Sequence, residues 1–161
     1  MIKIHKHSGI YSLIAEQMVD LPVEECWHFF SKPNNLQTIT PDYMGFNITS
    51  PFQEGKMYAG QIISYKVAPV AGIKMNWVTE ITHVKEGKFF VDEQRFGPYR
   101  FWHHQHHFIE KGGQTLMKDI VSYQLPFGFL GRMSHSILVK PKLLDIFRYR
   151  EARIKELLQK R

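Results

Sequence analysis

Apolar and polar residues alternate along most of the chain, and this period-two pattern is typical of half-buried β-strands. Stretches rich in β-branched and aromatic residues predict seven strands, at residues 10–20, 45–50, 57–67, 73–84, 88–96, 100–110 and 114–125. Short turn segments separate the later strands, including Gly97-Pro98 and Lys111-Gly112-Gly113. Because the links between the last six strands are short, we expect one antiparallel meander.

Three regions follow helical spacing instead. A helix is expected from Val23, since Pro22 and two glutamates suit a helix start, and a shorter one at 34–39 ends before Pro41. Near the C-terminus, one apolar stripe comprises Ile137, Leu144, Phe147, Ile154 and Leu158. Pro141 interrupts this stretch and either kinks one long helix or begins its main body.

The order of elements restricts the architecture. A large sheet beside a single amphipathic helix leaves apolar surface exposed unless the sheet curls around that helix. Aromatic residues make up 14% of the 161 residues, enough to build a core and to line a cavity as well. We therefore expect a single α+β domain over 1–161. Its seven-stranded curved antiparallel sheet surrounds a long C-terminal helix, with two short helices after the first strand and a cavity between sheet and helix.

Charge and cysteine content narrow the class of protein. The single cysteine, Cys26, excludes a disulfide framework and indicates a reducing compartment. No apolar run approaches the ~20 residues of a membrane span, and no signal-peptide block follows the N-terminus, so we expect a soluble, cytoplasmic protein. The net charge of +6 lies within residues 132–161. Because no nucleic-acid-binding motif accompanies it, we interpret it as a solvated basic face, with attraction to an anionic partner or membrane surface as the alternative.

The most unusual local feature is Trp102-His-His-Gln-His-His107, which places four histidines within five residues. On a strand, successive side chains point to opposite faces. One face then carries Trp102, His104, His106 and Phe108, and the other carries His103, Gln105 and His107. We expect the first set to face inward because aromatic residues flank its two histidines.

Turn lengths predict which residues lie opposite these histidines. A three-residue loop beginning at Gly97 sets Asp92 opposite His104. The next hairpin loop sets either His104 or, after a slip of one residue at each end, His106 opposite Asp119. Both registers place two histidines and two carboxylates on the inner face. Burial there is costly unless these groups pair with one another.

This cluster has four interpretations: a paired polar network that fixes the register, the polar end of a ligand pocket, a metal site, or an acid–base centre. We assign no metal, because cross-strand pairing already uses the imidazoles. We also assign no cofactor and no catalytic residue, since suitable residue types alone do not show a reaction. The residues that we expect to bind a ligand are Trp77, Phe90, Asp92, Gln94, Trp102, His104, His106, Asp119, Tyr123 and Phe147.

Several motifs also resemble a known family. They are Phe90-Val-Asp-Glu-Gln94, the segment Gly97 to Phe108, Gly113-x-Thr-Leu-Met-Lys-Asp119 and Leu125-Pro-Phe-Gly128. The chain resembles the START-like superfamily of helix-grip domains, in its polyketide cyclase/dehydratase-like or coenzyme-Q-binding-like branch. Similar domains occur fused to epimerase-like proteins. The resemblance spans Ile10 to Leu158 and implies a cavity for lipids, quinones, hormones or polyketides.

Three functions are compatible with these observations. The first is binding of a small apolar or amphipathic molecule. The second is a cyclase or dehydratase that uses His104 or His106 as acid or base, and the third is an accessory domain that binds a partner through its basic C-terminal helix. The pattern favours binding, because it supplies a pocket but no complete catalytic unit. We expect no nucleic-acid partner, and the sequence indicates no particular oligomeric state.

Overall fold

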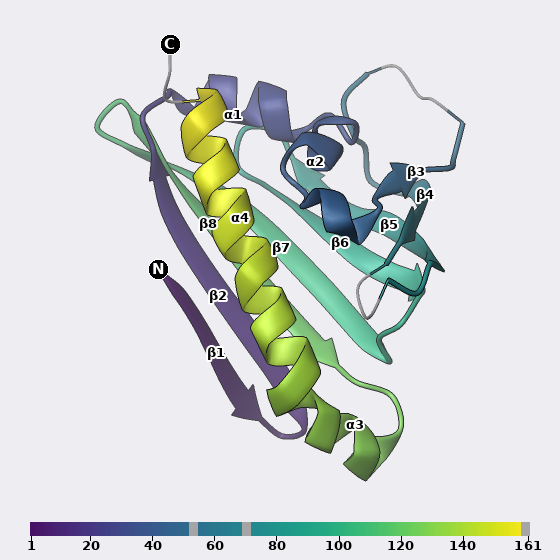
Figure 1. Cartoon of the computed structure of the whole chain (residues 1–161). Helices are drawn as coiled ribbons and strands as arrows, with labels where there is room; N and C mark the ends of the chain where they lie inside the picture. Colours follow the sequence, from purple (N-terminus) through teal and green to yellow (C-terminus); the bar gives the residue numbers. More distant parts are fainter. Residues whose placement is uncertain (52–54, 69–71, 159–161) are drawn as a thin grey trace.

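The computed structural model describes residues 1–51, 55–68 and 72–158. Its strands are β1 (Ile2–His7), β2 (Ile10–Val19), β3 (Asn47–Ile48), β4 (Gln61–Val67), β5 (Met75–Lys85), β6 (Phe89–Phe96), β7 (Phe101–Lys111) and β8 (Gln114–Gln124). They form one antiparallel sheet in the order β1-β2-β8-β7-β6-β5-β4-β3. The helices are α1 (Val23–Phe30), α2 (Asn35–Thr38), the 3-10 turn η1 (Asp42–Met44), α3 (Gly128–Ser134), the π-helical turn η2 (His135–Val139) and α4 (Lys140–Leu158). The long helix α4 crosses one face of the curved sheet (Figure 1).

The predicted α+β architecture is confirmed, but the sheet has eight strands among the described residues rather than seven. The additional strand is β1, which pairs with β2 through a tight turn at Ser8 and Gly9, both with positive φ. Its sequence gives a weak strand signal, because only Ile2 and Ile4 are partly buried and the other side chains of β1 are exposed. The predicted strand at 45–50 is reduced to the two residues of β3.

The hairpin between β7 and β8 adopts the second of the two predicted registers. Lys111 pairs with Gln114 around Gly112 and Gly113, which sets His106 opposite Asp119. Both glycines have positive φ, as a two-residue hairpin turn of type I′ requires. The conformational freedom of this glycine pair therefore selects the shorter loop.

The C-terminal helix begins its main body at Pro141, in the first turn of α4, as one of the two alternatives predicted. Its buried side chains are Leu143, Phe147 and Ile154. The predicted apolar stripe is wrong at Ile137, which is 74% exposed. The reason is the π-helical geometry of η2: its wider turn puts this residue out of phase with the buried face of α4.

Two clusters of buried side chains hold the sheet to the helices. The larger one joins α1 to β4–β8, with Trp27 packed edge-on against Phe108 at 5.6 Å. The smaller one joins α4 to β2 and β8 around Leu13, Val121 and Phe147. Between these clusters, α4 and the α1–η1 segment stand over the inner face of β4–β7, where the cavity described below lies. None of the described helices is both long and apolar enough to cross a membrane.

Candidate functional site

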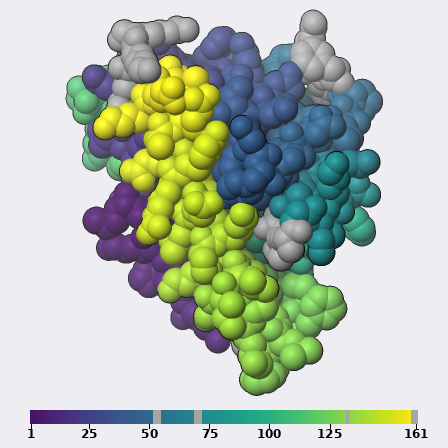
Figure 2. All heavy atoms as spheres, viewed as in Figure 1, coloured from purple at the N-terminus to yellow at the C-terminus, as the bar shows by residue number. Residues whose placement is uncertain are grey.

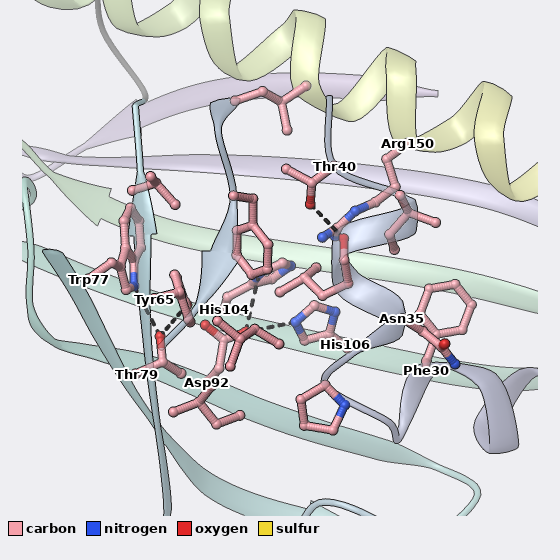
Figure 3. A pocket seen from close by; sticks show the side chains of 18 of the residues that line it. Phe30, Asn35, Thr40, Tyr65, Trp77, Thr79, Asp92, His104, His106 and Arg150 are labelled. Carbon is pink, nitrogen blue, oxygen red and sulfur yellow. Dashed lines mark hydrogen bonds and ion pairs between the residues drawn. The ribbon is translucent and has the colours of Figure 1, made fainter. Parts of the chain in front are cut away.

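A cavity of about 180 Å³ lies between the inner face of the sheet, α4 and the α1–η1 segment (Figure 3). Most of its wall is apolar. Its aromatic lining consists of Phe30, Phe46, Tyr65, Trp77, Phe90, Tyr99, Trp102 and Phe147. Two sets of polar residues also line it: Thr79, Asp92, His104, His106 and Arg150 from the sheet and α4, and Lys32, Asn35 and Thr40 from the α1–η1 segment.

The aromatic wall is packed in arrangements that ring quadrupoles favour. Trp77 and Trp102 are perpendicular, with ring centroids 5.3 Å apart, and Tyr99 lies 4.7 Å from Trp102. Such edge-to-face and offset contacts stabilise a pair by about 0.5–1.5 kcal/mol beyond simple burial. The wall therefore keeps its shape without filling the cavity.

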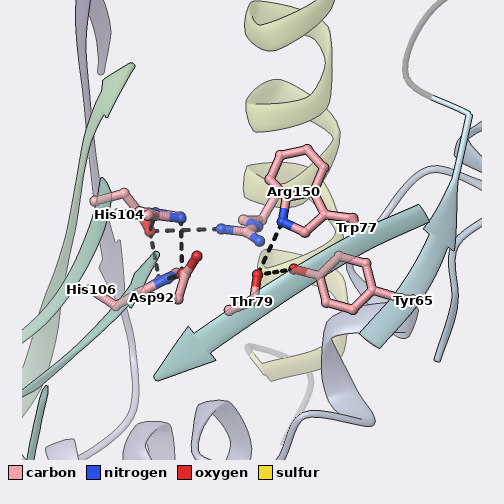
Figure 4. A network of polar contacts seen from close by, with 8 residues as sticks. Tyr65, Trp77, Thr79, Asp92, His104, His106 and Arg150 are labelled. Atoms are coloured by element: carbon pink, nitrogen blue, oxygen red, sulfur yellow. Dashed lines mark hydrogen bonds and ion pairs between the residues drawn. The ribbon is translucent and has the colours of Figure 1, made fainter. Parts of the chain in front are cut away.

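Thr79 satisfies the polar atoms of two of these rings. Trp77 Nε1 donates a hydrogen bond to Thr79 Oγ1 at 3.0 Å, and the Tyr65 hydroxyl shares a hydrogen bond of 2.6 Å with the same oxygen (Figure 4). Burial is the main cause that raises the pKa of Tyr65, so its phenol remains neutral. Because these groups pair with one another, the rings present mainly apolar surface to the cavity.

The histidine and aspartate side chains form a closed square of polar contacts. The rear carboxylate, Asp119, has Oδ1 at 2.8 Å from His104 Nε2 and 3.0 Å from His106 Nδ1. On the cavity side, Asp92 Oδ2 lies 2.8 Å from His106 Nε2 and 3.4 Å from His104 Nδ1. Each imidazole is thus held between two carboxylates contributed by neighbouring strands (Figure 4).

The two imidazoles differ in their preference for a proton. Burial and the neighbouring His106 lower the pKa of His104, despite the nearby carboxylates. Burial opposes a charge on His106 too, but its hydrogen bonds with Asp119 and Asp92 outweigh burial and raise the pKa of its imidazole. We infer that His106 carries the proton and that His104 donates from Nε2 alone, which agrees with the longer 3.4 Å contact at its Nδ1.

Arg150 of α4 completes the charge balance of this cluster. Its Nη1 lies 3.6 Å from Asp119 Oδ1, and its guanidinium is 5.4 Å from the Phe147 ring centroid. With His106 protonated, two cations face the two carboxylates, and burial of the cluster leaves no net charge. Arg150 lines the cavity, and its Nε is buried without a hydrogen-bond partner among the described residues.

Sequence reasoning did not identify Arg150. The sequence does indicate that Arg150 lies on the buried face of α4. Its spacing from Leu143, Phe147 and Ile154, at steps of four, three and four, puts all four residues on one face of the helix. An arginine on an apolar helical stripe needs a buried partner. The partner lies more than thirty positions away in the sequence, and only the folded sheet brings it close.

Seven of the ten predicted ligand-binding residues line the cavity: Trp77, Phe90, Asp92, Trp102, His104, His106 and Phe147. Three others do not line it. Asp119 lies behind the histidines, and Gln94 hydrogen-bonds both the backbone N–H and the carbonyl of Tyr99, so it holds the β6–β7 turn. Tyr123 is fully buried, pairs with His135 at 2.8 Å and packs behind the aromatic wall, with its ring centroid 5.8 Å from that of Tyr99 and 6.1 Å from that of Trp102.

Asp92, His104 and His106 also have the spacing of metal ligands, since one ligand atom from each lies within 4.8 Å of the others. However, the free ring nitrogens of both histidines converge on the same oxygen, Asp92 Oδ2, rather than on an open position. The geometry is that of a hydrogen-bonded cluster in which the carboxylate already occupies the point of convergence.

Next to the cavity, η1 and α4 contact each other. The Tyr43 hydroxyl donates a hydrogen bond to Asp145, and the Lys142 ammonium lies 3.4 Å from the centre of the Tyr43 ring. Burial and the adjacent Asp145 raise the pKa of this phenol, so it remains a donor. Met44 and Ile146, next to these residues, line the cavity.

Comparison with solved structures identifies the architecture as a helix-grip fold, at sequence identities that show a shared fold alone. Protein Ms6760 from Mycobacterium smegmatis has a TM-score of 0.64 at 17% identity, with 99% of this chain and 96% of that chain covered. Protein CV1439 from Chromobacterium violaceum has a TM-score of 0.69 at 10% identity, with coverage of 93% and 99%. Major latex-like protein 151 from Panax ginseng has a TM-score of 0.64 at 15% identity, with coverage of 94% and 99%. No protein-family model and no curated protein matches the chain.

Proposed function

We propose that this protein binds a small hydrophobic or amphipathic molecule in the cavity between the sheet and α4. The observation that carries the proposal is the lining: aromatic and aliphatic side chains surround the space, and two sets of polar residues lie on its wall. Ligand sites in proteins commonly combine a concave apolar surface with a few polar groups that orient the ligand.

The volume restricts the ligand. A cavity of about 180 Å³ is slightly larger than the ~150 Å³ apolar cavity that is known to accept benzene. It suits a compact body of one or two rings without displacement of the walls. Within the lipid, quinone or polyketide-like classes that the family resemblance implies, we favour a ring-containing ligand such as a quinone or a small polyketide.

The polar end restricts the polar group of that ligand. Asp92 offers acceptor oxygens, and Arg150 offers a donor, while the charges of the cluster balance. A neutral hydroxyl or carbonyl can use either atom without disturbing this balance. A carboxylate placed against this cluster would add a buried charge that the cluster does not balance, which is unfavourable.

We favour binding over catalysis because the groups with acid–base character are already paired. His104 and His106 each contact both carboxylates, and no nucleophile lies beside them among the described residues that line the cavity. A catalytic base needs a free position within reach of the substrate proton. The cluster therefore acts best as a rigid polar platform.

A pair of neighbouring isoleucines on β4 allows a matched test. Ile63 lines the cavity, whereas Ile62 points to the other face of the sheet and is 48% exposed. We expect wild-type protein and Ile62→Trp to bind 2-naphthol, a two-ring phenol, with similar affinity in isothermal titration calorimetry. Ile63→Trp should reduce the affinity at least tenfold, because the added ring occupies the cavity. Equal binding by both variants, or no binding by the wild type, would contradict the proposal.

A further inference from the structure

An unusual concentration of exposed apolar side chains lies on α3 and η2, at the end of the molecule where the β1–β2 hairpin also lies (Figure 1). Figure 2 shows this segment protruding at the lower end of the molecule, in green. Its exposed side chains, here called the apolar tip, are Phe127 (82% exposed), Phe129 (65%), Leu130 (69%), Met133 (55%), Ile137 (74%) and Leu138 (51%). Surface hydrophobic residues scattered singly are ordinary, but a contiguous set of this kind marks an interaction site.

The segment has an inverted pattern of burial. Its fully buried side chain is polar: His135 is 4% exposed, bonds the Tyr123 hydroxyl at 2.8 Å and stacks on Tyr11 at 3.6 Å. Val139, at the end of η2, is partly buried against the smaller core cluster. A helix that covers its own core buries apolar residues and exposes polar ones. Here the polar side fastens the segment to β2 and β8, and the apolar side faces outward.

The backbone before α3 is held in a constrained conformation, with the apolar side chains facing outward. Phe127 has a φ of 64°, a left-handed conformation that bulky residues rarely adopt. Behind it, α3 packs so closely on Pro126 that a Cβ on Gly131 would lie 2.0 Å from the Pro126 carbonyl oxygen. Unfavourable backbone conformations persist where the surrounding structure imposes them, and they are concentrated at functional sites.

The chain segments that form and surround the apolar tip contain basic residues but no acidic ones. The sequence contains no Asp or Glu between residues 120 and 144, nor between residues 1 and 15. Lysines lie close by: the Lys6 ammonium is 5.5 Å from the centre of the Tyr11 ring, on which His135 stacks, and Lys140 directly follows η2. Lys6 and Lys140 are both exposed. The surface is therefore apolar at its end and basic around its base.

We propose that the apolar tip docks this protein onto an anionic lipid membrane surface. The six apolar side chains enter the boundary between headgroups and acyl chains, and the lysines at the base contact lipid phosphates. This two-part surface matches both layers of a lipid interface, where buried apolar area and attraction to anionic lipids add together. The absence of carboxylates favours this occupant over a second copy of the chain, whose own basic groups would face those of the first.

The test uses co-sedimentation with vesicles of phosphatidylcholine, alone or mixed with an equal amount of phosphatidylglycerol. Wild-type protein should sediment with the phosphatidylglycerol vesicles, and the bound fraction should fall as sodium chloride is added, because salt screens the lysines. Lys6→Gln with Lys140→Gln should remove most of the preference for anionic vesicles.

Two double variants separate the tip from general surface hydrophobicity. Leu130→Ser with Ile137→Ser should weaken vesicle binding at least tenfold. Ile62→Ser with Ile109→Ser removes two exposed isoleucines from the sheet, 48% and 39% exposed, and should bind as the wild type does. Circular dichroism and 2-naphthol binding check that each variant is folded, so loss of docking is distinguishable from loss of the cavity.

Several results would overturn the proposal. One is wild-type protein that stays in the supernatant with both kinds of vesicle. Another is equal vesicle binding by the two double variants. A third is a dimer in analytical ultracentrifugation that Leu130→Ser with Ile137→Ser dissociates, without vesicle binding by the wild type. That outcome would assign the tip to contact between copies of this chain.

Discussion

At the scale of single residues, four charged groups balance at the polar end of the cavity. The cations His106 and Arg150 face the carboxylates of Asp92 and Asp119. Alternation along β7 correctly placed His104 and His106 on the inner face, and turn lengths brought Asp92 opposite His104. The sequence could not show which histidine holds the proton, because that depends on burial and on distances of a few tenths of an ångström. The structure favours a His104 that is hydrogen-bonded to Asp119 and has a lowered pKa.

The first prediction concerns the rear carboxylate. Asp119→Asn should destabilise the fold by about 3–5 kcal/mol, because it leaves the His106 imidazolium and Arg150 buried with one counter-ion fewer. Glu93→Gln is the matched control: Glu93 pairs with His103 and Arg95 on the outer face, where a solvent-accessible pair contributes less than about 1 kcal/mol. Urea unfolding monitored by circular dichroism measures both changes. Equal losses in the two variants would show that the inner cluster is not a buried ionic network.

The second prediction concerns pH. The pKa of His106 is raised above its ordinary value of 6.5 in the folded state, so its stabilising contribution is present below pH 6.5 and is lost as pH rises through the folded value. Asp92, His104 and Asp119 face it from β6, β7 and β8, and Arg150 of α4 lies against Asp119. Compared with His106→Gln, the wild type should therefore be most favoured below pH 6.5, and its advantage should shrink at higher pH. The free energy of unfolding in urea, measured across this range, tests the sign; an advantage that grows with pH would refute it.

At the scale of elements, the turn residues predicted how strands pair better than strand propensity predicted where the strands lie. The Gly112-Gly113 pair left two registers open, and positive φ at both glycines selected the one in which His106 faces Asp119. Strand β1 was missed because its alternation contains only two isoleucines, and its stability comes from pairing with β2. Ile137 was misplaced because a π-helical turn cannot be recognised from a 3.6-residue period.

The third prediction concerns how closely α3 packs. Gly131→Ala would set a Cβ at 2.0 Å from the Pro126 carbonyl oxygen, so the helix must shift away from the preceding loop. Overpacking of this kind costs about 1–3 kcal/mol. Ser136→Ala, at an exposed position of η2, is the control and should change stability by less than about 0.5 kcal/mol. Thermal unfolding of the two variants compares them, and a wild-type melting temperature for Gly131→Ala would mean that α3 is not held against Pro126.

At the scale of the whole molecule, the helix-grip architecture follows from the order of elements and from the surplus of aromatic residues. A curved sheet that meets a single long helix encloses space, and the aromatic side chains line this space. The class of ligand that we propose does not follow in the same way. It depends on the size of the cavity and on Arg150, and both result from contacts between elements far apart in the sequence.

The last prediction distinguishes a tryptophan that lines the cavity from one that packs in the hydrophobic core. Trp77 and Trp27 are both buried, at 8% and 4% exposure, but only Trp77 lines the cavity, whereas Trp27 packs between Phe90 and Phe108. Replacement of either by alanine should destabilise the protein by about 3–5 kcal/mol, because each removes a large buried ring. Trp77→Ala should in addition weaken 2-naphthol binding about tenfold, since it removes a contact surface of the ligand, and Trp27→Ala should leave the affinity of the folded protein near the wild-type value. Calorimetric titration at a temperature where both variants are folded distinguishes the two effects. Similar affinity losses in both variants would mean that binding depends on the general integrity of the core and not on the aromatic wall of this cavity.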